Sequence, residues 1–460
     1  MRTEVLVIGA GPAGLAAAAR LAEEGRQVRL LARGNGFTHW GAGAIDVLGR
    51  VNQRRVERPV EAIGELPADH PYRLVGAGAL RSGLEWFQRF AAVAGLEHAG
   101  DPGANRDQIT ALGTLRPTCL LPAPAAGELG GHVAVLGFEG FRDFSPALCA
   151  AGLQRRAGQD GMRVSTGLVE LPAWNHPRYF TAIELAQAID DEDFRARLAP
   201  GLSRAAGGAG TAVVPAVLGL RAGHEPWADL ERRTGLRLVE AAIPPPSVPG
   251  LRLFFAYRAR LTGLGVRWQF GFPALGVERR GDQVIAVRSE GASREITIRC
   301  QELVLATGGV AGRGIEARRD GSMVEVVAGL PVSGLPTGGP DGEAAAAPGT
   351  AAAAPGIAST ASRDRSAFVG PRFLGGHPMA AAGVRVDAEL RPVDGAGSPL
   401  CANLRCVGGL LAGHDPTVEG SREGVALATA TRLAEVLAPA TSHAAGGPGV
   451  GPRVDQGGSR

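Results

Sequence analysis

The feature that most constrains the fold is a glycine-rich turn near the N-terminus, set between a short apolar segment and an alanine-rich one. Residues 4–8 are predicted to form a buried strand, and residues 14–24 a helix that ends at Gly25. The turn between them has the pattern Gly-x-Gly-x-x-Gly over residues 9–14. In this spacing the first glycine permits a tight turn, the second lets backbone amides approach an anion, and the third lets helix and strand pack closely. Because the start of a helix carries unpaired N–H groups and about half a positive charge, the turn is predicted to bind a phosphate.

Residues 27–32 follow as a second strand and complete a βαβ unit of the dinucleotide-binding, Rossmann-like type. Its predicted cofactor contacts are Gly9, Gly11, Pro12, Ala13 and Gly14. Such a site usually has an acidic residue at the end of the second strand, where it accepts hydrogen bonds from an adenosine ribose. This chain has Arg33 and Gly34 there instead. Since a cation suits a phosphate better than a ribose diol, we expect both residues to contact the cofactor. We also expect FMN, or a 2'-phosphorylated nicotinamide, rather than FAD or NAD, with FAD as the alternative flavin and a plain surface arginine as the alternative role.

Two further glycine motifs lie far along the chain. Strand-like segments separated by tight turns fill residues 266–299 and predict a β-meander, which an apolar strand ending in Thr-Gly-Gly at 307–309 follows. This order is typical of the strand that returns to the cofactor in flavoproteins. A Val-Gly-Gly sequence at 407–409 then precedes the last helix, predicted for residues 419–437. Such a helix points its positive end at N1 and the C2 carbonyl of the flavin ring, although a plain turn before a packing helix gives the same pattern. The predicted contacts are Thr307, Gly308, Gly408, Gly409 and Gly420.

Together the motifs predict a mixed α/β chain, a two-lobe flavoprotein of the FAD/NAD(P)-binding, Rossmann-like type with a β-meander and an inserted α/β lobe. A nicotinamide-only enzyme needs neither the meander nor the distant helix. A segment of Gly, Pro and Ala blocks and the C-terminal tail bury too little apolar surface to offset the cost of ordering, so both are expected to be disordered. The predicted parts are 1–50 with 246–333 and 363–439 for a discontinuous flavin-binding lobe, 51–245 for the inserted lobe, 334–362 for the disordered insertion and 440–460 for the disordered tail.

Composition argues against several other functions. A net charge of +3 over 460 residues gives no dense basic field, so nucleic acid is not an expected partner. All 48 basic residues are arginines, which is typical of a genomic composition bias, so no arginine is assigned a role from its type alone. The five cysteines are scattered without a C-x-x-C pair, so we expect buried reduced thiols and no metal site. No apolar run reaches the roughly 18 to 20 residues of a membrane-spanning helix, so any membrane contact is expected to pass through a partner.

A series of short segments, taken in order, resembles one known family. The segments are residues 33–34, 39–48, 70–72, 112–118, 137–144, 245–250 and 413–416. Over most of its length, apart from the insertion before Arg363 and the tail, the chain is similar to the B subunits of anaerobic glycerol-3-phosphate dehydrogenases. The resemblance implies an FMN-containing protein that pairs with an FAD-containing catalytic A subunit, while an iron–sulfur C subunit links the pair to the membrane and quinone. It also implies the oxidation of sn-glycerol 3-phosphate to dihydroxyacetone phosphate, in a cytoplasmic complex held on the inner face of the cell membrane.

Four side chains are candidates for the chemistry of such a reaction, which needs a base for the hydroxyl proton and cations for the phosphate of the substrate. His39 and His377 are the candidate proton carriers, and Arg116 and Arg313 the candidate cations. Each is also compatible with a packing, loop or surface role, and none need be catalytic if the substrate is held by the partner instead. Two other functions stay open. One is a structural or assembly role with an idle site, and the other is a free-standing FAD reductase or NADP-dependent oxidoreductase on the same fold.

Overall fold

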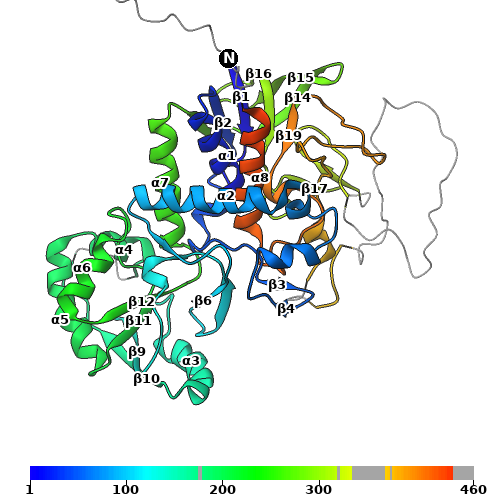
Figure 1. Cartoon of the computed structure of the whole chain (residues 1–460). Coiled ribbons are helices and arrows are strands. Elements are labelled where there is room, and N and C mark those ends of the chain that lie inside the picture. Colours follow the sequence, from blue (N-terminus) through cyan, green and yellow to red (C-terminus); the bar gives the residue numbers. More distant parts are fainter. Residues whose placement is uncertain (175–178, 319–321, 334–367, 373–375, 439–460) are drawn as a thin grey trace, which may run out of the picture.

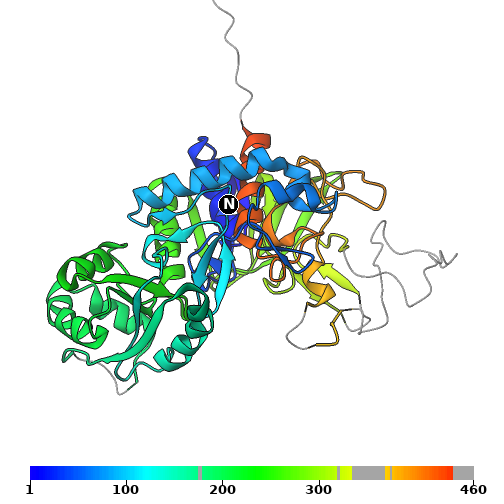
Figure 2. The ribbon, with the colours of Figure 1, turned by 60° about the horizontal axis from the view of Figure 1, so that its bottom comes forward.

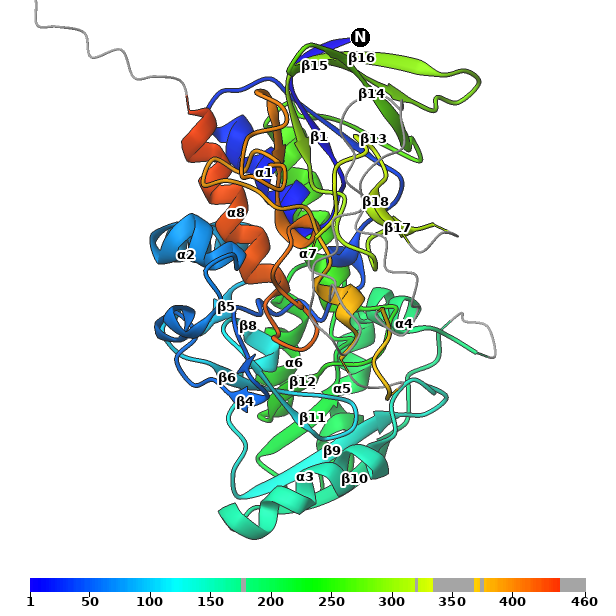
Figure 3. The same ribbon diagram turned by 90° about the vertical axis from the view of Figure 1, so that its right-hand side faces the viewer.

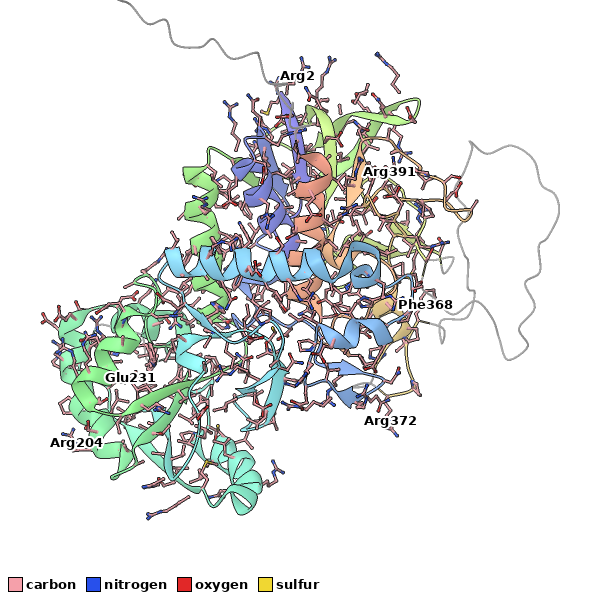
Figure 4. All side chains as sticks on the ribbon, viewed as in Figure 1. Arg2, Arg204, Glu231, Phe368, Arg372 and Arg391 are labelled. Atoms are coloured by element: carbon pink, nitrogen blue, oxygen red, sulfur yellow. The ribbon has the colours of Figure 1, made fainter. Side chains whose placement is uncertain are left out.

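The computed structural model describes residues 1–174, 179–318, 322–333, 368–372 and 376–438. Two lobes lie side by side, each built on its own main β-sheet with its own hydrophobic core (Figure 1). The larger lobe contains the N-terminal strand and the last helix, and Figure 2 shows the smaller lobe projecting from one side of it. In Figure 4 the label Arg204 marks the smaller lobe and Arg391 the larger. The segments predicted to be disordered, 334–362 and 440–460, lie outside the described residues.

The sheet of the larger lobe is built around the N-terminal strand β1 (Arg2–Ile8). This strand lies between β2 (Val28–Ala32) and β16 (Ile296–Leu305) and runs parallel to both. Its apolar side chains are buried, as expected for a central parallel strand with both faces covered. The sheet has the order β13-β2-β1-β16-β15-β14, and β19 also pairs with β16. The other strands of this sheet are β13 (Arg267–Phe270), β14 (Ala274–Arg280), β15 (Gln283–Ser289) and β19 (Leu404–Cys406).

The predicted meander differs from the structure in two details. Residues 266–270, expected as its first strand, contribute β13, which instead pairs in parallel with β2. The helix α7 (Val248–Gly263) precedes β13, and a crossover helix is what delivers a strand in the parallel direction. The last segment of the predicted meander, which ends at residue 299, and the separate apolar strand predicted before Thr307 form the single strand β16, since no glycine or proline interrupts them. The antiparallel meander therefore consists of β14, β15 and β16.

A group of helices packs together beside this sheet (Figure 3). The alanine-rich helix α1 (Pro12–Glu23) packs against both α7 and α8 (Arg422–Leu437). Helix α2 (Pro71–Val93) lies across α8, as Figure 1 shows. Within α2 the backbone departs from helical geometry at Gly76, where φ is +82°, so the helix is kinked there. These helices place the N-termini of α1 and α8 close to the ends of the parallel strands.

The contact between α2 and α8 depends on a small residue, which gives a first prediction. A Cβ added at Gly83 would lie 2.9 Å from both the carbonyl oxygen of Leu427 and the Oγ1 of Thr431. Overpacking costs about 1 to 3 kcal/mol, against a gain of about 1 kcal/mol in helix propensity. We therefore expect Gly83→Ala to lower the free energy of unfolding by about 1 kcal/mol in urea denaturation. Gly78→Ala, on the same helix but with no atom within 4 Å of the added Cβ, is the control. It should raise stability by about 0.5 to 1 kcal/mol. Equal shifts in the two variants would contradict the close packing.

The smaller lobe has a parallel four-stranded sheet in the order β10-β9-β11-β12. Its strands and helices are β9 (His132–Phe138), α3 (Pro146–Asp160), β10 (Arg163–Val169), α4 (Ala182–Ile189), α5 (Glu192–Ala206), β11 (Thr211–Pro215), α6 (Glu225–Thr234) and β12 (Arg237–Ala241). Its hydrophobic core begins in the sequence at Ile109 and ends at Leu251. Buried side chains from Val51 to Leu96 pack instead in the core of the larger lobe, because α2 covers α8. The second core thus starts later than the predicted boundary at residue 51.

The remaining elements are short. They are η1 (Phe37–His39), β3 (Arg50–Val51), β4 (Arg54–Arg55), η2 (Glu61–Glu65), β5 (His98–Ala99), β6 (Arg106–Ile109), β7 (Leu115–Thr118), β8 (Leu121–Pro122), η3 (Ala123–Ala125), β17 (Ile315–Ala317), β18 (Met323–Glu325), η5 (Pro378–Ala381) and η6 (Gly408–Leu410). All five cysteines are buried and unpaired. Across the described residues, none of the helices is long and apolar enough to cross a bilayer. The same residues contain no group of three or more His, Cys, Asp or Glu side chains suited to a metal ion.

Candidate functional site

The turn between β1 and α1 is packed so closely that two of its glycines admit no side chain. A Cβ at Gly9, where φ is +116°, would lie 2.3 Å from the carbonyl oxygen of Ala306, and a Cβ at Gly14 would lie 1.9 Å from that of Gly9. Gly11 differs from both, because no atom lies within 4 Å of the position its Cβ would take. No side chain caps the N-terminus of α1 either. The turn therefore leaves open space at the positive end of a helix, which suits a phosphate.

The two later glycine motifs lie against this turn. Gly408, with φ of +66°, is so close to α1 that an added Cβ would lie 2.4 Å from the Cβ of Ala13. In the turn after β16, a Cβ on Gly309 would lie 2.8 Å from the carbonyl oxygen of Gly409. The structure thus brings the three motifs together in one place, although most of the chain separates the first from the last.

The other predicted cofactor contacts lie around the same region. Gly420 precedes α8 with φ of +63°, and its carbonyl accepts a hydrogen bond from the backbone N–H of Gly49 at 3.3 Å. Arg33 and Gly34 directly follow β2 and are exposed, and no atom lies within 4 Å of a Cβ added at Gly34. Thr307 lies two residues after the end of β16, and Gly308 comes next with φ of +77°. The end of β2 is therefore open to solvent.

A small cavity lies between the N-termini of α1 and α8. Its lining includes Pro12 of α1, Thr38 and Gly41 of the segment after β2, Tyr257 of α7 and Glu423 of α8. Its volume of about 30 Å³ is room for about two water molecules. The cavity adjoins the glycine-rich turn but is too small for an aromatic ring system.

Arg116, a candidate cation for the phosphate of the substrate, is engaged with an acidic side chain. It forms an ion pair with Asp46 through Nη1 and Oδ2, and its Nη2 donates to Gln108 Oε1 at 2.6 Å. Glu423 carries a second carboxyl nearby. Burial, reinforced by the charge of Asp46, raises the pKa of Glu423 to about 7. Arg116 thus lies beside the carboxyl groups of Asp46 and Glu423, which together form a carboxylate cluster at the start of α8.

A hydrogen-bonded network that sequence reasoning missed lies just before α8. His70 accepts from the backbone N–H of Tyr72 at Nδ1 (3.1 Å), so Nε2 carries the proton and donates to Glu419 Oε2 at 3.2 Å. Ser421 Oγ donates to the same oxygen at 2.9 Å. Burial alone would raise the pKa of Glu419, but the hydrogen bond from His70 holds this pKa below its ordinary value. The ring of His414 lies 5.9 Å from that of His70 between centroids, and burial lowers the pKa of His414 to about 4.

The other three candidate side chains lie on separate segments. His39 is half-buried in η1, with its ring edge-on to Trp40 and Phe254 at centroid distances of 4.8 and 5.6 Å, and burial lowers its pKa. Arg313 is exposed in the turn after β16, with φ of +59°. His377 Nδ1 accepts a hydrogen bond from the backbone N–H of Gly370 at 3.0 Å. Of the four candidates, Arg116 is the one whose contacts are with the carboxylate cluster.

Four buried oxygen atoms in this region have no hydrogen-bond partner within the described structure. They are Thr38 Oγ1, Asp46 Oδ1, Thr307 Oγ1 and Glu423 Oε2. A buried polar atom left without a partner costs about 1 to 3 kcal/mol. Such atoms beside a phosphate-type turn fit a site that polar groups from outside the chain complete. A flavin carries both hydrogen-bond donors and acceptors and can pair with Thr307, while water in the cavity can pair with Thr38 and Glu423.

Comparison with known proteins identifies the class that this fold and site define. A model of the FAD binding domain family matches residues 4–425. The chain is therefore a flavoprotein of the FAD-binding, oxidoreductase type, and the expected fold class is confirmed. It is 30% identical to the B subunit of the anaerobic glycerol-3-phosphate dehydrogenase of Vibrio cholerae, over 95% of this chain and 97% of the relative. It is 29% identical to the protein of the same name from Yersinia enterocolitica, over 96% and 99%.

The chain belongs to the family of anaerobic glycerol-3-phosphate dehydrogenase B subunits, as the resemblance in its short segments predicts. Among solved structures, it is similar to a 3-ketosteroid-Δ4-(5α)-dehydrogenase from Rhodococcus jostii. That match has 11% sequence identity and a TM-score of 0.37, over 95% of this chain and 96% of the other.

Proposed function

We propose that this chain is a flavoprotein component of a quinone-linked glycerol-3-phosphate dehydrogenase, with its flavin held at the turn between β1 and α1. The observation that carries the proposal is the similarity, over nearly the whole length, to relatives named as B subunits. When bound, a flavin supplies a two-electron acceptor for the oxidation of an alcohol carbon. The complex would oxidise sn-glycerol 3-phosphate to dihydroxyacetone phosphate and pass the electrons to a membrane partner and quinone.

The residues of the three glycine motifs hold and orient the cofactor in this proposal. The N-terminus of α1, open at Gly11, binds phosphate through backbone N–H groups. Thr307 Oγ1, buried and without a partner in the described structure, is available for a hydrogen bond to the ligand. Gly408 lets the backbone of η6 approach α1, because an added Cβ would lie 2.4 Å from the Cβ of Ala13, and Gly409 lies against Gly309 of the second motif.

The form of the flavin is proposed to be FAD. The matching family is described as an FAD binding domain, which favours FAD. The expectation of FMN came from Arg33, but that side chain is exposed and the space at Gly34 is open, so an adenosine moiety is not blocked there. Heat release of the cofactor from purified protein, followed by chromatography, should give FAD. FMN in equal amount to the protein would contradict this choice, and no flavin at all would contradict the proposed function.

We propose that the substrate binds to the FAD-containing A subunit, while this chain relays electrons toward an iron–sulfur C subunit. Arg116 supports substrate binding by the A subunit rather than by this chain, because its guanidinium is paired with Asp46 and Gln108 instead of being free for a phosphate. In this proposal the complex is cytoplasmic and is held on the inner face of the membrane through the C subunit. His39, His377 and Arg313 would then have no catalytic role in this chain.

Reduction of the bound flavin tests the relay. Glycerol 3-phosphate should bleach the flavin absorbance of this chain only after the A subunit is added. Bleaching of the isolated chain would show that it binds the substrate itself. A colourless chain that still assembles with the A subunit would favour a structural or assembly role. Bleaching of the isolated chain by NADPH would favour a free-standing oxidoreductase.

A further inference from the structure

The cavity between the N-termini of α1 and α8 is bordered by polar atoms to which the proposed function assigns no role. Thr38 lines the cavity with only 7% of its surface exposed, and its Oγ1 has no partner within the described structure. Glu423 lines the same cavity from the first turn of α8, and its Oε2 is buried and unpartnered among the described residues. Asp46 is 9% exposed, follows the lining residue Ile45, and has an unpartnered Oδ1. Two of these unpartnered oxygen atoms therefore belong to residues that line one small cavity, and the third belongs to the residue that follows a lining residue.

The two carboxyl groups would be costly to bury if both were ionised. An ionised carboxylate has only acceptors, so neither group satisfies the other, and two like charges repel. A proton on one of them removes a charge and converts an acceptor into a donor. Arg116 forms an ion pair with Asp46. The proton therefore belongs on Glu423.

We propose that Glu423 holds a proton on Oε2 and, with Thr38 and water in the cavity, forms a proton-holding site beside the phosphate-binding turn. The existence of this site does not require a flavin. Its use rests on the proposed function, because a proton held here is available to balance charge when a flavin bound at the turn is reduced.

The charged groups that face Glu423 act in opposite directions. Burial and then Asp46, on the segment after β2, raise the pKa of Glu423 to about 7, whereas Arg422 on α8 and Arg116 on β7 lower it. The proton is therefore held below about pH 7 and lost as the pH rises through that value. Burial raises the pKa of both phenols on the neighbouring helices, so these stay neutral. They belong to Tyr72 on α2 and Tyr257 on α7.

Infrared spectroscopy of the purified full-length chain tests the site directly, because a protonated carboxyl absorbs apart from a carboxylate. We expect a protonated-carboxyl band that disappears on titration with a midpoint near pH 7 and is absent from Glu423→Gln. Glu435→Gln removes a half-exposed carboxyl from the same helix and should keep the band. Lack of the band in the unmodified protein, or its persistence in Glu423→Gln, would overturn the proposal.

Two further variants test the surroundings. Asp46→Asn removes the neighbouring negative charge and should move the midpoint of the band to lower pH. Arg116→Gln removes a nearby cation and should move it to higher pH. A midpoint that moves in neither variant would show that the titrating group is not Glu423 in this cluster.

Measurements on flavin-loaded protein test whether reduction of the flavin is coupled to the proton at Glu423. The dependence of the midpoint potential on pH counts the protons taken up with two electrons. Glu423→Gln should take up fewer protons than the unmodified protein around neutral pH, while Glu435→Gln should match it. If Glu423→Gln takes up as many protons per two electrons as the unmodified protein, flavin reduction is not coupled to Glu423. If no flavin binds at all, the proposed function fails, while the infrared result still decides the proton site.

Discussion

Gly11→Ala is expected to weaken flavin binding on the order of 100-fold, equal to about 2.8 kcal/mol, while costing at most about 1 kcal/mol of stability. The backbone at Gly11 has φ of −76°, which alanine adopts without strain, and its Cβ would meet no protein atom within 4 Å. That space is the proposed position of the phosphate, so the added methyl would displace the ligand and leave the fold intact. Fluorescence titration with flavin and urea denaturation measure the two effects separately.

Two glycines serve as controls for this prediction. Gly14→Ala places a Cβ 1.9 Å from the carbonyl oxygen of Gly9, so it should lower both stability and flavin binding. Gly64→Ala, exposed in η2 with no atom within 4 Å of the new Cβ, should change neither. Unchanged flavin affinity in Gly11→Ala would mean that the phosphate does not bind at this turn.

The sequence predicts the first βαβ unit well because its signals are local. The predicted strand at 4–8, helix at 14–24 and strand at 27–32 correspond to β1, α1 and β2, with ends that differ by no more than two residues. Each is an apolar run followed closely by a glycine, at Gly9, Gly25 or Gly34, so the information lies within a few residues. The same holds for the last helix, where the predicted start at 419 precedes α8 by three residues.

Strand pairing and side-chain contacts are harder to predict from the sequence than the first βαβ unit, because they depend on residues far apart in the sequence. The pairing of β13 with β2 joins Arg267 to Arg29, and nothing near either residue indicates it. His70 and Glu419 are 349 positions apart, so their hydrogen bond is invisible in the sequence, although both lie in or near segments that carry the family resemblance. Arg116 is a further example. Its residue type allows a phosphate ligand, and only the fold shows that Asp46 neutralises it.

The connection between the lobes gives the prediction with the largest expected loss of stability. Helix α7 contributes Leu251 to the core of the smaller lobe and Leu253 to that of the larger. Between them, Arg252 is 3% exposed and forms two hydrogen bonds, at 2.8 and 3.0 Å, with Glu240 of β12, which is 1% exposed. Its Nε also donates to the carbonyl of Gly219 at 2.8 Å. The pair of Arg252 and Glu240 therefore links α7, which contributes to both cores, to the sheet of the smaller lobe.

Removing one member of this pair should cost about 3 to 5 kcal/mol, because the other charge remains buried without its partner. Arg252→Met leaves the carboxylate of Glu240 unpaired, and Glu240→Gln leaves the guanidinium unpaired, so both variants should show the loss in urea denaturation. Arg260→Gln is the matched control on the same helix. Its ion pair with Glu23 is partly exposed, with side-chain exposures of 46% and 24%, so its loss should cost less than about 1 kcal/mol. Equal losses in the free energy of unfolding at the two pairs would mean that water reaches Arg252. The contact of α7 with the smaller lobe would then depend on apolar packing alone.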